Sequence, residues 1–169
     1  MRAKKFTAAV VMAAIAAIGF APLANAAVRP TTAQKLQLQY LIEEEKLARD
    51  VYLYLAANVT TSKFSNIAKS EQTHMDQIAA VLKTYNYFNP TTTRAPGVFR
   101  DKSLQALYNT LIAQGSVDVA AAMQVGRDIE NLDIKDLQVM LKSTMPAAMK
   151  LALDNLLKGS YNHLAAFNR

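Results

Sequence analysis

The stretch FSNIAKSEQTHM (residues 64–75) carries the most informative pattern in the sequence. Its apolar residues recur at intervals of three and four, which is typical of a helix with one face in a core. Glu71 and His74 lie on that same face, one turn apart. Glu-x-x-His on a buried helix face is a metal-binding spacing, so this stretch predicts a helix that supplies both core packing and a pair of metal ligands.

The rest of the chain repeats this helical periodicity without the alternation of strands, so the predicted class is all-α. Long helices are expected over about 32–58, 62–85, 116–143 and 146–167, and a short one over about 103–114. Ser116 is the predicted N-cap of the third long helix. Short links join the first helix to the second and the third to the fourth, whereas a long connection with the short helix joins the second to the third. One long crossover predicts a ferritin-like antiparallel four-helix bundle.

The first residues read as an export signal. A basic start precedes an apolar run over 8–20 and an Ala-Asn-Ala end. This order predicts a signal peptide over 1–26, cleaved after Ala26, and a mature domain over 27–169 that is periplasmic or secreted. The apolar run contains a glycine and is shorter than the roughly 20 residues that a membrane-spanning helix needs. No stable membrane anchor is therefore expected.

Composition narrows the classes of function. The formal net charge of +6 falls to about +3 without the three basic residues of the predicted leader, and no basic cluster is interleaved with aromatics. Nucleic acid is therefore not an expected partner. The chain has no cysteine, which excludes disulfides, thiolate metal ligands and a cysteine nucleophile. The methionines are dispersed at helical spacing, which favours core packing over copper binding.

Polar residues also interrupt the apolar stripes of the other long helices. The first helix offers Glu45, but Glu44 lies on an overlapping apolar face, and periodicity leaves both open. The inward-facing polar residues of the last two long helices are Glu130, Asp133, Ser160 and His163. A buried lone carboxylate costs several kcal/mol unless it is paired or binds a cation. Several of them facing one core predict a shared positive ion.

A general template exists for di-iron and di-manganese bundles. It takes one Glu from each of two helices and Glu-x-x-His from each of the other two. The residues that match it in order are Glu45, Glu71, His74, Glu130 and His163. Ser160 stands where the fourth helix would supply a carboxylate. The predicted cofactor is iron, as one or two ions, with manganese as the alternative.

Three motifs make the chain similar to a known family. EEEKLARDVY (residues 43–52), FSNIAKSEQTHM and GSYNHL (residues 159–164) resemble the ferritin-like family filed as domain of unknown function 2202, a distant relative of the rubrerythrins. The resemblance covers nearly all of the mature chain. Rubrerythrins carry Glu-x-x-Ala-Arg-x-x-Tyr on the first helix, so the resemblance selects Glu45 over Glu44. It also implies Asp133 as a second acid on the third long helix.

Several of these residues have other interpretations. Glu45 stands four residues before Arg49, a spacing that forms ordinary surface ion pairs. Asp133 follows Asn131 and Leu132, where short polar side chains can mark a local helix irregularity. The phenol of Tyr52 is placed to hydrogen-bond a metal ligand. Ser160 is placed to contact a metal-bound water, or to leave space beside Gly159.

The family resemblance implies a metal-centred oxidation–reduction role, with oxygen or peroxide as substrate. Rubrerythrins usually add a cysteine-ligated iron module, which this chain lacks, so an external electron donor, as yet unknown, would be needed. The alternative is a non-enzymatic helical stress-response or interaction module whose metal site has degenerated, as Ser160 suggests. Catalytic residues, a homodimer and a ferritin-like storage shell are left open by the sequence.

Overall fold

The computed structural model describes residues 28–169, which form five helices and no strands. The helices are α1 (Thr32–Asn58), α2 (Lys63–Thr84), α3 (Lys102–Gly115), α4 (Val119–Leu141) and α5 (Ala147–Phe167). The predicted all-α class is confirmed, while the predicted leader lies outside the described residues. Among the helices of the described part, none is long and apolar enough to cross a membrane.

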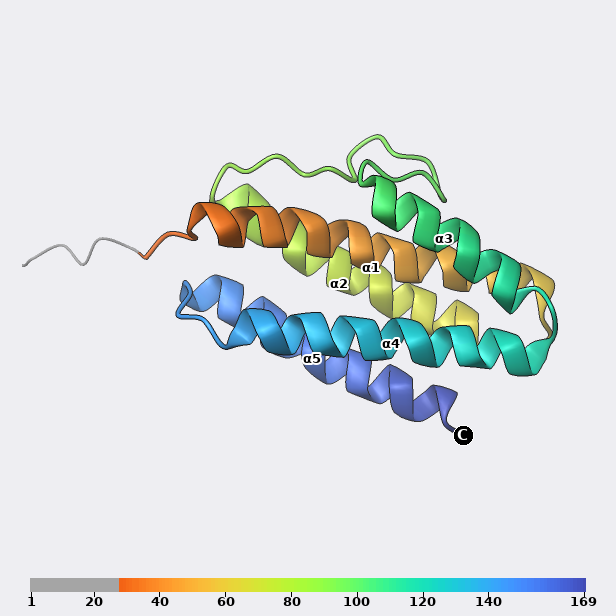
Figure 1. The fold of residues 1–169 in the computed structure, drawn as a ribbon. Coiled ribbons are helices and arrows are strands. Elements are labelled where there is room, and N and C mark those ends of the chain that lie inside the picture. Colours follow the sequence, from red (N-terminus) through yellow and green to blue (C-terminus); the bar gives the residue numbers. More distant parts are fainter. Residues whose placement is uncertain (1–27) are drawn as a thin grey trace, which may run out of the picture.

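The four long helices lie side by side in two antiparallel pairs (Figure 1). The pair α1–α2 and the pair α4–α5 are each joined by a short link, and the pairs meet where α2 packs on α5 and α1 on α4. The long connection over residues 85–118 runs back along the molecule, so α2 and α4 point in the same direction. The helix α3 within this connection packs against both α1 and α4.

Hydroxyl and carboxylate caps mark where α1, α3 and α4 begin. Thr31 and Gln34 form a capping box at the start of α1. The prediction of Ser116 as the N-cap of α4 is wrong, because its backbone is still helical and it ends α3. Asp118 has the extended backbone of an N-cap instead, and its carboxylate accepts a hydrogen bond from the Ala121 amide at 2.7 Å.

The core consists of two apolar clusters with polar side chains between them. One cluster contains Tyr52, Phe64 and Phe167, whose ring centroids lie 5.3–5.9 Å apart. The other is built from aliphatic residues and methionines such as Leu38, Ile78 and Leu156. The intervening buried polar residues come from all four long helices; they are Glu45, Glu71, His74, Glu130, Asp133, Ser160 and His163. Packing on both sides therefore shields this polar layer from water.

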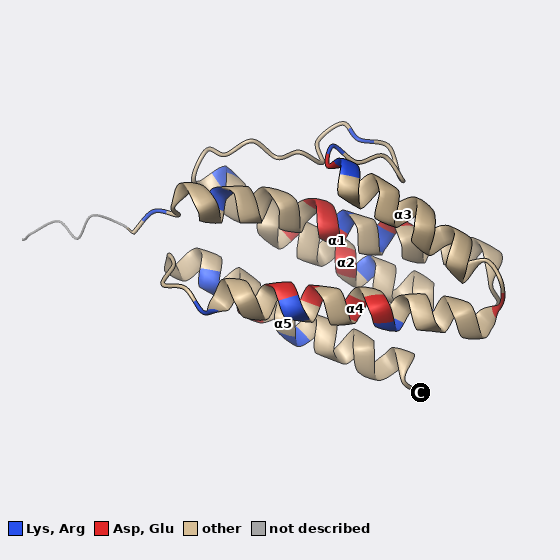
Figure 2. Cartoon of the chain, viewed as in Figure 1, with Lys and Arg blue, Asp and Glu red and all other residues tan. Residues whose placement is uncertain are grey.

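A second set of buried charges attaches the long connection to α1. Glu43, Glu44, Glu45 and Lys46 are consecutive, and each is at most 4% exposed; Figure 2 shows acidic and basic positions in the middle of α1. Lys46 pairs with Asp50 and donates to the Ala95 carbonyl at 2.9 Å. Asp50 also accepts from the Gly97 amide at 2.8 Å, and Glu43 accepts from two further amides of the connection. The sequence pattern did not predict burial of Glu43 or Lys46.

Removing Asp50 should be far more damaging than removing the matched exposed acid Asp154. Lys46–Asp50 and Lys150–Asp154 are both Lys–Asp pairs at i, i+4, but the side chains of the first are at most 1% exposed and those of the second 57% and 47%. Asp50→Ala leaves a buried, unpaired ammonium and should cost about 3–5 kcal/mol, whereas Asp154→Ala should cost about 0–1 kcal/mol. Urea unfolding of both variants measures the difference, and equal losses would contradict the buried pairing.

Candidate metal centre

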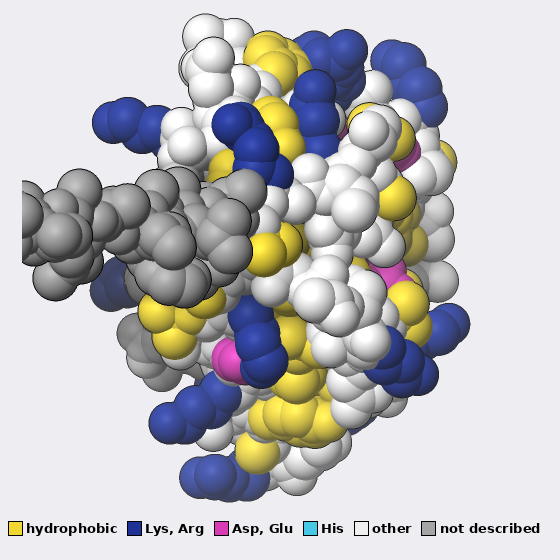
Figure 3. Space-filling model, turned by 90° about the vertical axis from the view of Figure 1, so that its left-hand side faces the viewer, with side chains coloured by type: hydrophobic (Ala, Val, Ile, Leu, Met, Phe, Trp, Pro, Cys, Tyr) yellow, Lys and Arg dark blue, Asp and Glu magenta, His cyan; other side chains and the backbone are white. Residues whose placement is uncertain are grey.

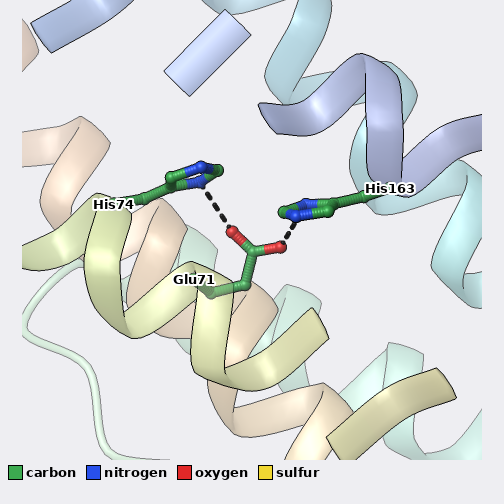
Figure 4. Close-up of side chains that lie close together, drawn as sticks. All are labelled: Glu71, His74 and His163. Carbon is green, nitrogen blue, oxygen red and sulfur yellow. Dashed lines mark ion pairs between the residues drawn. The ribbon is translucent and has the colours of Figure 1, made fainter. Parts of the chain in front are cut away.

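Glu71 lies between two imidazoles in the middle of the polar layer (Figure 4). Its Oε2 is 2.8 Å from Nδ1 of His74 on the next turn of α2, and its Oε1 is 2.8 Å from Nδ1 of His163 on α5. The two rings are stacked with centroids 5.4 Å apart. One ligand atom from each of the three residues lies within 4.8 Å of the others, so this buried group can hold a metal ion.

A second carboxylate flanks each histidine. Glu45 Oε2 on α1 is 3.1 Å from His74 Nδ1, and Glu130 Oε2 on α4 is 3.5 Å from His163 Nδ1. Both glutamates are 1% exposed. The structure thus brings five of the six predicted ligand residues together, one or two from each long helix. Their role as metal ligands stays a prediction.

Neighbouring hydroxyls fix the orientation of this group. The Tyr52 hydroxyl donates to Glu130 Oε1 at 2.7 Å, the type of supporting contact expected for this phenol. Ser70 Oγ lies 2.8 Å from Nε2 of His163, so it can accept the proton on that ring nitrogen while Nδ1 faces the carboxylates. Ser70 was missed by the sequence argument because it lies off the apolar stripe, and no signal marks it.

Asp133, the sixth predicted ligand, lies beside the group and contacts Ser160. The Ser160 hydroxyl donates its one proton in a shared contact with Asp133 Oδ2 and the Leu156 carbonyl. α4 continues as regular helix through Asp133, so the alternative of a local irregularity is wrong. The other carboxylate oxygen, Oδ1, has no hydrogen-bond partner within residues 28–169.

Glu44 and Glu45 are both buried, but they face different surroundings. Glu45 contacts His74, whereas neither oxygen of Glu44 has a hydrogen-bond partner in the described part of the chain. The alternative of a Glu45–Arg49 ion pair is wrong, because the Arg49 guanidinium binds Asp50 at 2.7–2.9 Å. Geometry therefore places Glu45, and not Glu44, at the histidines.

Gly159 allows α5 to approach His74. A Cβ atom at this position would lie 2.3 Å from Nε2 and 2.6 Å from Cε1 of the imidazole, closer than any real contact. Ser160 was expected to contact a metal-bound water or to leave space beside Gly159. The close approach of α5 to His74 depends on Gly159 itself, whose missing side chain leaves room for this histidine of α2. Any larger residue here would displace the His74 ring from Glu71.

The charges of the group shift one another's pKa values. Burial alone would lower the pKa of His74, but hydrogen bonds with Glu45 and Glu71 raise it to about 11. Hydrogen bonds with Glu130 and Glu71 raise the pKa of His163 to about 10 in the same way. Burial raises the pKa of Glu45 and Glu130, while the two imidazoles outweigh burial at Glu71 and lower its pKa. In the metal-free protein the Nδ1 protons of the two imidazolium rings therefore lie between the carboxylates, at the place where a metal ion could bind.

These residues fit a transition-metal ion by the chemistry of their donors. Imidazole nitrogens and carboxylate oxygens suit iron, manganese and zinc. Glu45 Oε1 and Asp133 Oδ1 are buried oxygens without a hydrogen-bond partner among the described residues, as expected for atoms that a cation would satisfy. Each histidine presents Nδ1 to the shared carboxylate, so replacing the proton on Nδ1 by a metal keeps the arrangement of the side chains.

The metal-free protein should lose stability as the pH rises above neutral. The folded-state pKa values of His74 and His163, about 11 and about 10, lie above the usual histidine pKa of 6.5. Their stabilising charge is therefore complete below about pH 6.5 and is lost as the pH rises through the folded pKa values. In chelator, the thermal midpoint should fall by about 5 °C or more between about pH 7 and about pH 9.5. Saturating Mn(II) should reduce this fall, and a flat or rising midpoint in chelator would contradict the ion pairing.

Comparison with known proteins gives the family. Residues 34–169 match the family model described as "Uncharacterized protein domain (DUF2202)". An uncharacterised protein of Methanocaldococcus jannaschii, MJ0754, is 44% identical over 127 residues, which is 75% of this chain and 69% of that protein.

A solved structure shows that this similarity extends to the fold. The crystal structure of hypothetical protein MJ0754 from Methanococcus jannaschii superposes with a TM-score of 0.80 at 41% identity, covering 82% of this chain and 79% of the other. Both comparisons are with MJ0754, and neither description of it states a function. Since the family model spans all five helices but the first two residues of α1, the chain belongs to the DUF2202 family.

Proposed function

We propose that this protein is a ferritin-like metalloprotein that holds iron or manganese between carboxylates and histidines and uses it for oxidation–reduction with oxygen or peroxide. The observation that carries the proposal is the position of Glu71, whose two oxygens each contact an imidazole from a different helix. The proposed ligands are Glu45, Glu71, His74, Glu130 and His163, with Asp133 beside them. As an exported protein it would act in the periplasm or outside the cell.

The order and direction of the helices support a ferritin-like relationship. A long connection between the second and third long helices makes α2 and α4 parallel, as one long crossover does in ferritin-like bundles. The ligand order along the chain also follows the di-iron template, with Glu71 and His74 one turn apart on α2. A distant relation to the rubrerythrins would account for both features.

The protein's own residues would bind and orient such an ion and keep bulk water from it. His74 and His163 offer Nδ1, and Ser70 holds the other ring nitrogen of His163. Tyr52 fixes Glu130 through its hydroxyl, and the aromatic cluster around it seals one side of the polar layer. When bound, iron or manganese would supply the one-electron chemistry that these side chains lack. A carboxylate-rich site favours the higher oxidation state of the metal. An electron donor would therefore be needed to return the metal to its lower oxidation state.

Ser160 supports a second candidate, a non-enzymatic helical stress-response or interaction module with a degenerate metal site. The template places a carboxylate at this position, and a serine supplies no negative charge. In the structure, however, Ser160 donates to Asp133, so a carboxylate from α4 lies against the serine of α5. This contact favours a site with a rearranged ligand set over a degenerate one.

Metal content tests the proposed function directly. Protein purified from cells supplied with iron should contain iron, and Glu71→Gln and His74→Ala should lower the iron content by about tenfold or more. The matched control is Asp76→Asn, which changes an exposed acid on the same helix. Elemental analysis of the four proteins measures the effect.

The same proteins also separate the two candidates. Addition of Fe(II) or Mn(II) should raise the thermal midpoint of the native protein and of Asp76→Asn, because a ligand of the folded state stabilises it. Equal metal content in all four proteins, with midpoints that do not respond to metal, would contradict the metalloprotein and favour the helical module.

A further inference from the structure

A solvent-accessible groove of about 370 Å³ lies between α1 and α4, the packed pair of helices that make the least contact with each other. Leu36 and Val139 at its edge are 60% and 52% exposed, so solutes can reach it. Its polar lining comes from both helices and consists of Gln37, Tyr40, Glu44 and Asp136. The groove is therefore an apolar-edged hollow with oxygen donors inside it.

Glu44 is the unusual member of this lining. It is only 4% exposed, and neither of its carboxylate oxygens has a hydrogen-bond partner within residues 28–169. The charged groups that act on it are Asp133 and Asp136, which are both acidic. A buried carboxylate among like charges costs several kcal/mol unless a proton or a cation neutralises it.

No positively charged side chain of the groove lining is available to neutralise Glu44. No lysine, arginine or histidine lines the groove, whereas Figure 2 shows acidic positions on both α1 and α4. Figure 3 shows lysine and arginine side chains projecting into solvent around the end of the molecule that it views. The groove therefore attracts a cation from solution.

We propose that the groove binds a hard divalent cation through the carboxylate of Glu44, with Asp136 as its second charged ligand. The neutral oxygens of Gln37 and Tyr40 complete the polar part of the lining, which contains no imidazole; the lining's one sulfur is the thioether of Met140, a soft ligand that a hard cation does not favour. Oxygen-only sites suit Mg²⁺, Ca²⁺ and Mn²⁺, whereas imidazole in the histidine group also suits zinc and iron. The groove is thus a second cation site, with a different metal preference, and it does not depend on the proposed redox function.

An EPR titration with Mn(II) tests the site, because binding removes the signal of the free ion. Glu71→Gln provides the background, since it disables the histidine group without removing a groove residue. We expect this variant to retain one Mn(II) site, and the double variant Glu44→Gln/Glu71→Gln to bind Mn(II) about tenfold more weakly or worse. The control Asp128→Asn/Glu71→Gln, which changes an exposed acid of α4, should stay within about twofold of Glu71→Gln.

The outcomes keep the two metal sites apart. If Glu71→Gln binds no Mn(II), or binds it equally well with and without Glu44→Gln, Glu44 is a neutral buried acid and the groove site is wrong. The difference between the native protein and Glu71→Gln reports on the histidine group alone. Circular dichroism establishes folding, and if the Glu44 variant is unfolded, Asp136→Asn in the same background decides by the same tenfold criterion.

Discussion

The sharing of one buried carboxylate by two imidazoles is the contact on which the rest of this structure depends. Glu71 is 2% exposed and contacts His74 within its own helix and His163 on α5, so it joins the two antiparallel pairs of helices at their centre. Burial alone would raise the pKa of this carboxyl group, and only positive charge on both sides keeps it ionised. Protons supply that charge in the metal-free protein, and a metal ion can replace them.

The need for positive charge on both sides of buried Glu71 is met by features of several helices. The glycine at position 159 lets α5 approach closely enough for His74 to fit between the helices. Apolar clusters close the polar layer on both sides, so water cannot stabilise the charges. On the outer side of α1, Lys46 and Asp50 fasten the long connection through its backbone. The same helix therefore contributes to the buried polar layer, lines the groove and holds the long connection.

Much of this architecture could be predicted from the sequence, because helical periodicity records which face is buried. The helix α1 was predicted over its observed range, and Glu45, Glu71, His74, Glu130 and His163 were placed on inner faces where they do meet. Periodicity failed where tertiary structure covers the outer face as well. Glu43 and Lys46 look like a solvated charge run, and only the folded connection reveals why they are buried. The choice of Asp118 over Ser116 as a cap depended on backbone conformation that side-chain types alone do not fix.

The most direct test of the central claim is the anomalous scattering of manganese in crystals grown with Mn(II). An anomalous peak is expected between Glu71, His74 and His163, with Nδ1 of both imidazoles turned toward it. A map without a peak there, from crystals in which both imidazoles still pair with Glu71, would contradict a metal centre and would leave the buried ion pairs as a structural element alone.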